Sequence, residues 1–283
     1  MILGLSLWIA AVIFLVALFC EYMDSTLGMG YGTTLTPVLL LLGFTPLQVV
    51  PAVLLSELIT GLLAGFFHHR EGNVNFRPKT YNPSLIMQSL HSLGYIESFR
   101  RGFPLHLKVV FLLAACGIIG TIAAVFIALN IPKFWLKLYI GCLVLSMGVI
   151  IIICLNREFK FSWKKITSLG LIASFNKGMS GGGYGPVVTG GQILAGVEGK
   201  SAVGITSLAE GLTCLVGVIT YYAISKGSVD WKLAPFIIVG AVCSVPFSAI
   251  SVKRINTKQL KLAIAILTII LGTVTIVKTL HIV

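Results

Sequence analysis

Long apolar runs separated by short polar connections extend over the whole chain. We divide it into about ten apolar segments, at residues 3–22, 27–43, 47–67, 108–130, 134–155, 163–177, 180–197, 201–223, 234–252 and 259–280. A helix needs about 20 residues to cross a hydrocarbon core of roughly 30 Å, so the second, sixth and seventh segments are short. The pattern predicts an all-α polytopic membrane protein with eight to ten transmembrane helices.

The sequence contains an internal repeat with an offset of 153 residues. Residues 24–60 placed over residues 177–213 without a gap give 11 identities in 37 positions. The identical pairs are Gly28 and Gly181, Gly30 and Gly183, Tyr31 and Tyr184, Gly32 and Gly185, Thr36 and Thr189, Leu41 and Leu194, Gly43 and Gly196, Val50 and Val203, Leu55 and Leu208, Glu57 and Glu210, and Thr60 and Thr213. Shared apolar composition does not explain matches of glycine, tyrosine and glutamate. The chain is therefore predicted to hold two homologous repeats, residues 1–155 and 156–283.

The positions of the charges predict an orientation in the membrane. Basic residues cluster at 70–108, 157–165 and 253–261, and if all ten segments cross, the positive-inside rule makes these connections cytoplasmic. Five crossings per half would make the two repeats inverted, a common plan of transporters. The N-terminus would then lie outside, on a retained helix rather than a cleaved signal peptide. Re-entrant hairpins at 27–43 and 180–197 would instead give eight crossings.

Composition supports the membrane class and argues against others. With 57% hydrophobic and 11% charged residues and a mean hydropathy of +0.98, the chain is too apolar for a soluble domain. The excess of 21 basic over 9 acidic residues lies between apolar segments and does not indicate a nucleic-acid partner. No catalytic triad, nucleotide-binding loop or metal-type spacing occurs, so we expect no enzyme, cofactor or metal site. Six cysteines are expected to be reduced packing residues: Cys20, Cys116, Cys142, Cys154, Cys214 and Cys243.

The longest polar connection, residues 68–107, carries its own pattern. Apolar residues recur at roughly helical spacing between Ser84 and Phe99, which predicts an amphipathic helix on the cytoplasmic membrane interface. A solvated loop with local helix is the alternative. His68 and His69, at the end of the preceding apolar segment, are expected to be interfacial anchors.

Glycine clusters occur at equivalent places in both repeats. The clusters are Gly28, Gly30 and Gly32 in one repeat, and Gly178, Gly181, Gly182, Gly183 and Gly185, followed by Pro186, in the other. Glycine costs about 1 kcal/mol and proline about 3 kcal/mol relative to alanine inside a helix, so the helices should break here. Broken helices expose backbone N–H groups, and such groups at the start of a following half-helix are suited to hold an anion. The alternative is close helix packing through small residues.

Among the charged residues inside or at the ends of apolar segments, five are candidates for function: Glu21, Asp24, Glu57, Lys177 and Glu210. Lys177 is expected deep in the membrane, where its ammonium group needs an anionic partner. The candidates are the substrate, Glu21 and Asp24, and Asp24 is the residue that aligns with Lys177 in the other repeat. Snorkelling to the surface is the alternative. Glu57 and Glu210 lie near the middle of their segments, where a carboxyl group is a functional hypothesis by default. They could carry protons, or form a structural salt bridge between helices.

Hydroxyl groups next to the glycine breaks could hydrogen-bond an oxyanion. The candidates are Tyr31, Thr36, Ser180, Tyr184 and Thr189. With the N–H groups of Gly30, Gly32 and Gly181 to Gly185 and the charge of Lys177, they complete a predicted substrate site.

The glycine motifs of both repeats resemble the sulfite exporter TauE/SafE family of membrane permeases. The first motif is Gly28 to Pro37 followed by Leu41 to Gly43, and the second is Gly181 to Thr189 followed by Leu194 to Gly196. The first copy departs from the usual glycine run at Met29 and Tyr31, and the 68–107 connection is longer than expected. The resemblance implies secondary transport of sulfite, thiosulfate or an organosulfonate across the plasma membrane, which we combine with proton coupling and alternating access.

Two other functions fit the sequence: an anion channel, or a non-transporting scaffold acting through the 68–107 connection. The direction of transport, proton or sodium coupling, and monomer or homodimer are open at this stage.

Overall fold

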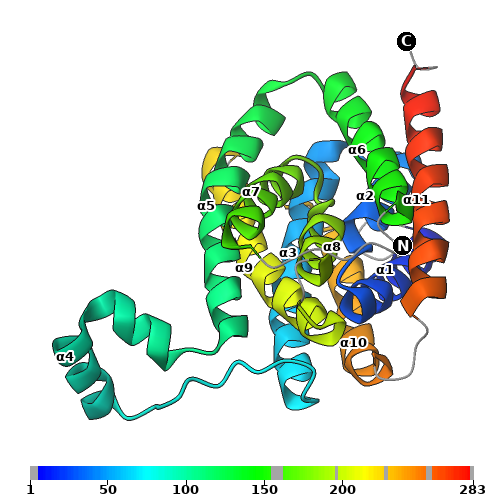
Figure 1. Ribbon diagram of the computed structural model, residues 1–283. Coiled ribbons are helices and arrows are strands. Elements are labelled where there is room, and N and C mark those ends of the chain that lie inside the picture. Colours follow the sequence, from blue (N-terminus) through cyan, green and yellow to red (C-terminus); the bar gives the residue numbers. More distant parts are fainter. Residues whose placement is uncertain (1–5, 154–161, 195–196, 226–228, 253–256, 281–283) are drawn as a thin grey trace.

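The structure, a computed structural model, describes residues 6–153, 162–194, 197–225, 229–252 and 257–280. In these ranges the chain folds into eleven α-helices and no strand (Figure 1), which confirms the all-α prediction. The helices are α1 Leu7–Leu27, α2 Tyr31–Leu41, α3 Pro46–Arg70, α4 Pro83–Gly102, α5 Leu105–Asn130, α6 Lys133–Ile153, α7 Trp163–Ser180, α8 Tyr184–Leu194, α9 Gly199–Ser225, α10 Ala234–Ser251 and α11 Thr257–Leu280. Cys154, Gly196 and parts of two predicted basic clusters, at 157–161 and 253–256, lie outside the described residues.

The helices follow the repeat seen in the sequence. Shifting α8 back by the offset of 153 residues gives 31–41, the bounds of α2, and shifting α9 gives 46–72, close to the 46–70 of α3. Helices α3 and α9 pack against each other, as do α6 and α11. Helix α5 packs on α7, and α10, which holds the equivalent place in the second half, packs on α1. Helices of each half thus pack on helices of the other half, and the two halves together form one bundle.

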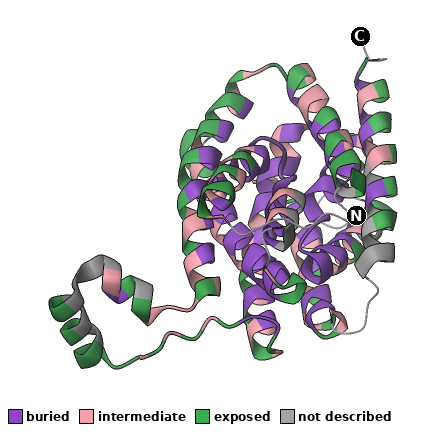
Figure 2. Cartoon of the chain, viewed as in Figure 1, coloured by how far each residue is buried: buried purple, intermediate pink, exposed green. Residues whose placement is uncertain are grey.

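Six helices are long and apolar enough to cross a membrane among the described residues: α1, α3, α5, α6, α9 and α10. Helices α2 and α8 have 11 residues each, about 16 Å of helix, roughly half of a hydrocarbon core. Large apolar side chains are exposed on the outer helices, such as Ile119 (68%) on α5 and Phe247 (67%) on α10, while the buried residues lie between helices (Figure 2). This surface suits lipid rather than water. The number of crossings and the inverted arrangement stay predictions.

Helices α1 and α4 can be compared with the predictions for their parts of the sequence. Helix α1 continues past the predicted end at residue 22 to Leu27, because Glu21 and Asp24 are buried inside the bundle instead of marking its surface. Helix α4 occupies the middle of the 68–107 connection, which confirms a helix there, and it stands away from the bundle (Figure 1).

Each half contains a helix broken at its glycines. Helix α1 ends at Leu27 before Gly28, which has a φ of 68°, and α7 ends at Ser180 before Gly181, which has a φ of 73°. Only glycine adopts such left-handed conformations without strain. We call Gly28–Gly32 the first corner and Gly181–Gly185 the second corner.

The two corners touch through their backbones. A Cβ atom added to Gly32 would lie 1.7 Å from the carbonyl oxygen of Gly181, and one added to Gly185 would lie 2.3 Å from the carbonyl oxygen of Gly28. Nothing larger than hydrogen fits at either position. The glycines therefore serve close packing, the alternative that the sequence left open, whether or not they also bind a substrate.

Replacing Gly32 by alanine should destabilise the protein strongly, because the new methyl group overlaps backbone that cannot rotate away. We expect a loss at or beyond the upper end of the ~1–3 kcal/mol typical of overpacking, measured by thermal unfolding of the detergent-purified protein. A suitable control is Gly199→Ala at the start of α9, where an added Cβ meets nothing within 4 Å and the change should stay within about 0.5 kcal/mol. Equal melting temperatures for the two variants would contradict the corner contact.

Candidate functional site

Five charged side chains are buried in the middle of the bundle. Glu21 and Asp24 come from α1, Glu57 from α3, Lys177 from α7 and Glu210 from α9, and none is more than 7% exposed. Lys177 has no exposed surface at all. The sequence prediction of a deep lysine is therefore supported by burial within the protein, and snorkelling to the surface is not what the structure shows.

Lys177 is held between two equivalent carboxylates. Its Nζ forms an ion pair with Oε2 of Glu57 and another, at 2.6 Å, with Oε1 of Glu210. Glu57 and Glu210 occupy the same position in the two repeats, so one ammonium group joins α3 of the first half to α9 of the second. The structure thus gives Lys177 partners other than Glu21 and Asp24, which the sequence proposed.

The other two acidic residues of the cluster, Glu21 and Asp24, accept hydrogen bonds from within the first half. Glu21 accepts hydrogen bonds from Ser25 Oγ at 2.5 Å and from Thr60 Oγ1 at 3.0 Å. Asp24 Oδ1 accepts the backbone N–H of Tyr31 at 3.1 Å, which places a carboxylate at the N-terminus of α2, where negative charge is favourable. The equivalent position before α8 carries Lys177 instead.

A small cavity adjoins all four carboxyl groups. It is lined by Glu21, Asp24, Glu57, Thr60, Gly61, Ser207 and Glu210, and its volume of about 10 Å³ is close to the room needed by one water molecule. Oε1 of Glu57 and Oε2 of Glu210 are buried without a hydrogen-bond partner. Four ionised carboxylates and one ammonium would bury a net charge of −3, which is very costly in a dry interior. Full ionisation of the cluster is therefore unfavourable.

A family model described as sulfite exporter TauE/SafE matches residues 13–81 and 82–275 of the chain. These ranges include every residue of the buried cluster and both corners. The chain belongs to this family.

A curated relative agrees with this assignment. The chain is 26% identical over 255 residues to "Probable membrane transporter protein YtnM" of Bacillus subtilis (strain 168), in an alignment that covers 85% of this chain and 74% of the relative. No solved structure matches the fold. This member of the TauE/SafE family is thus a multi-pass membrane transporter, as the resemblance implied.

In this TauE/SafE protein, three of the five predicted hydroxyl groups already form hydrogen bonds within the bundle. Thr189 Oγ1 donates to the carbonyl oxygen of Gly28 at 2.7 Å, which ties the second half to the first corner. Ser180 Oγ accepts the N–H of Gly182 at 3.0 Å, and Tyr31 Oη lies 2.7 Å from Ser56 Oγ. Thr36 Oγ1 is buried without a partner. Gly30 and Gly183, both with positive φ, and Tyr184, fully buried, complete the predicted set.

The corners and the ion cluster adjoin each other. The N–H of Gly28 bonds to the carbonyl oxygen of Asp24 at 2.5 Å, and the N–H of Gly181 bonds to that of Lys177 at 2.8 Å. Each charged residue therefore lies one helical turn before its corner.

Sequence reasoning missed some polar residues of the site. Ser207 lines the cavity, and Tyr221 Oη donates to the carbonyl oxygen of Gly178 at 2.9 Å across α7 and α9. Serine and tyrosine in apolar segments resemble ordinary packing residues, so only the three-dimensional contacts identify them.

The prediction for His68 was wrong. Its side chain is fully buried, with Nε2 2.8 Å from the carbonyl oxygen of Ser25 and Nδ1 3.1 Å from Asn73 Nδ2. Because α3 continues to Arg70, His68 faces α1 instead of the membrane surface.

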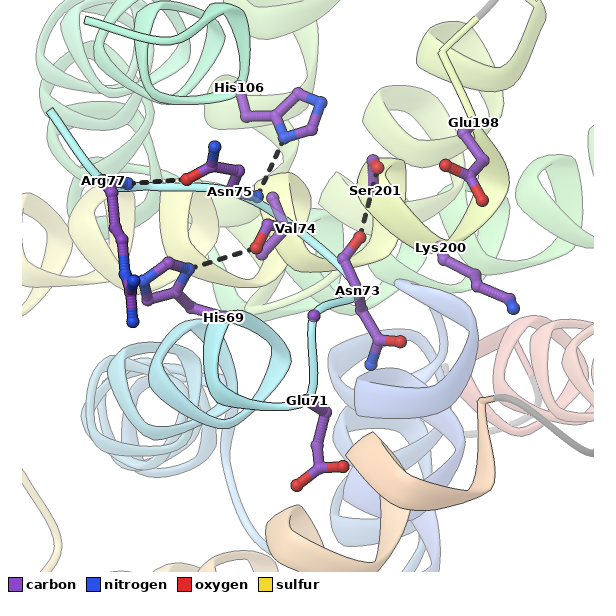
Figure 3. Close-up of a pocket in the computed structure, with 11 residues that line it drawn as sticks. His69, Glu71, Asn73, Val74, Asn75, Arg77, His106, Glu198, Lys200 and Ser201 are labelled. Carbon is purple, nitrogen blue, oxygen red and sulfur yellow. Dashed lines mark hydrogen bonds between the residues drawn. The ribbon is translucent and has the colours of Figure 1, made fainter. Parts of the chain in front are cut away.

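A second, larger pocket lies where α3 ends and α5 and α9 begin (Figure 3). Its volume is about 540 Å³, and its charged and polar lining includes His69, Asn73, Arg77, His106, Glu198 and Lys200. His106 Nδ1 accepts the N–H of Asn75 at 3.0 Å, and Ser201 Oγ donates to the carbonyl oxygen of Asn73 at 3.1 Å. These bonds fasten the segment after α3 to the bundle.

Replacing Lys177 by methionine should destabilise the protein by about 3–5 kcal/mol, because two buried carboxylates lose their shared partner. The triple variant Lys177→Met, Glu57→Gln and Glu210→Gln removes charge from all three sites and should recover most of that loss. Thermal unfolding in detergent measures both effects. If Lys177→Met alone is as stable as the wild type, the ammonium group does not neutralise the two glutamates.

Proposed function

We propose that this TauE/SafE protein moves a small sulfur-containing anion, such as sulfite, thiosulfate or an organosulfonate, across the plasma membrane by proton-coupled alternating access. The single observation that carries the proposal is the fully buried Lys177, bridged between Glu57 and Glu210. The name of the matching family supplies the substrate class.

The bridge suggests how binding of protons and of an anion would be coupled. With both glutamates ionised, the bridge carries a net charge of −1 and repels an anion. Protonation of one glutamate brings the bridge to neutrality, and protonation of both leaves a net charge of +1, which favours an anion in their place. Loss of the protons then restores the bridge and weakens the hold on the anion.

The corners would provide the second part of the anion site. Half-helices α2 and α8 direct the N–H groups of their first turns toward the corners, and such termini attract anions. Asp24 already caps α2 through the N–H of Tyr31, so in this proposal the substrate takes the side of α8, where Lys177 supplies positive charge. This use of broken half-helices is common among secondary transporters.

The proposal requires the corners to separate during transport. Their backbones touch in this structure, which leaves no passage between them, and the cavity beside the cluster holds about 10 Å³. We therefore assign the structure to an occluded state. Rocking of one half against the other would open the site to either side in turn.

Transport itself is tested with purified protein in proteoliposomes. We expect saturable uptake of at least one labelled anion among sulfite, thiosulfate and a simple sulfonate, driven by an inwardly directed proton gradient. Lys177→Ala should abolish uptake, because the positive charge at the site is lost. Conductance without saturation would indicate a channel, and no flux of any of these anions through folded protein would contradict the proposed function.

Proton coupling is tested separately with Glu57→Gln and Glu210→Gln. Each variant replaces a titratable group by a neutral amide of the same shape, so we expect accumulation to lose its dependence on pH while anion exchange continues. Glu198→Gln is the matched control, because Glu198 lies in the outer pocket and is exposed. Unchanged pH dependence in both cluster variants would remove the glutamates from the coupling mechanism.

A further inference from the structure

Helix α4 stands apart from the rest of the protein. It spans Pro83–Gly102 and lies beside the bundle, at the level where α3 ends and α5 begins (Figure 1). Among the described residues, no helix packs against it in more than a marginal contact, and Leu85 and Met87 are 50% and 59% exposed. Most helices draw their stability from packing of an apolar face. A surface outside this chain therefore has to cover α4.

The end of α4 is fixed against the lipid-facing side of the bundle. The ring of Phe99 on α4 lies 5.1 Å from that of Phe103, and both rings lie 5.9 Å from Phe111 on α5. Phe111 is 42% exposed on a helix that is apolar enough to cross the membrane. Only Phe103 and Pro104 separate α4 from α5. The C-terminal end of α4 therefore lies close to the bilayer surface.

The charge around α4 suits an anionic surface. Residues 70–108 contain six basic residues, Arg70, Arg77, Lys79, Arg100, Arg101 and Lys108, against two acidic ones, Glu71 and Glu97, for a formal charge of +4. Arg101 Nε and Glu97 Oε1 form an ion pair at 2.7 Å, so one of the two acids is compensated within the helix. A surplus of basic residues next to a membrane helix is typical of segments that bind anionic lipids.

We propose that α4 lies flat on the bilayer, with its apolar side chains at the acyl boundary and its basic residues on anionic lipid headgroups. The apolar exposure, the aromatic contact with α5 and the positive charge all favour this one partner. The proposal concerns the protein's seating in the membrane and does not depend on which anion it transports.

Hydrogen–deuterium exchange of the full chain tests the proposal. The protein is placed in nanodiscs of phosphatidylcholine alone or of phosphatidylcholine mixed with phosphatidylglycerol, and exchange is followed in residues 83–102. We expect slower exchange in the anionic discs. Each basic residue near an anionic surface is worth about fivefold in binding, so Arg100→Gln with Arg101→Gln should reduce the difference between the two lipids by roughly an order of magnitude.

For each variant, the exchange of α4 is compared between the two lipids. Any effect of the substitution on the stability of the helix itself is the same in both lipids and cancels. Lys164→Gln with Lys165→Gln at the start of α7 removes the same charge elsewhere and should leave α4 exchange as in the wild type. Equal exchange in both lipids would overturn the proposal. Protection that is equal in both lipids and rises with the protein concentration would indicate cover by a second copy of the chain instead.

Discussion

Backbone contact between the two glycine corners determines how the bundle can assemble. Because a Cβ at Gly32 or Gly185 would overlap the opposite backbone, the corners approach each other only with glycine at these places. Their contact brings the ends of α1 and α7 together and positions Asp24 and Lys177 one turn away. Helices α3 and α9, which follow the short half-helices, then pack on each other and deliver Glu57 and Glu210 to the same ammonium.

Stability alone does not explain the ion cluster. A buried salt bridge contributes little relative to well-packed apolar residues of similar volume, since desolvation offsets most of the Coulombic attraction. A cluster with four carboxyl groups for one lysine is worse balanced than a simple pair, and two of its oxygen atoms have no hydrogen-bond partner. The proposed mechanism accounts for such an arrangement, because it requires the cluster to exchange charge.

Sequence reasoning located the corners and the charged residues but not their pairing. The repeat predicts the broken helices because glycine and tyrosine recur at a fixed offset, which is a signal in the sequence itself. The partners of Lys177 depend on the crossing of α3 and α9, which no local pattern encodes. The sequence therefore points to the substrate or to Glu21 and Asp24, since the repeat pairs Asp24 with Lys177. His68 was misplaced for a related reason: a histidine pair before Arg70 is typical of a membrane boundary, whereas its burial depends on contact with Ser25 of α1.

The repeat differs most significantly at the position shared by Asp24 and Lys177. Two aspartates here would leave five carboxyl groups without a cation, and two lysines would leave the N-terminus of α2 without the carboxylate that accepts the Tyr31 N–H. Opposite charges let one half cap its own half-helix while the other half supplies the ammonium for both glutamates. The glycine corners therefore recur in both halves while the charge does not. In the proposed alternating access, states that exchange the roles of the two halves would differ in energy, and this asymmetry would give a duplicated scaffold the means to favour one direction of opening.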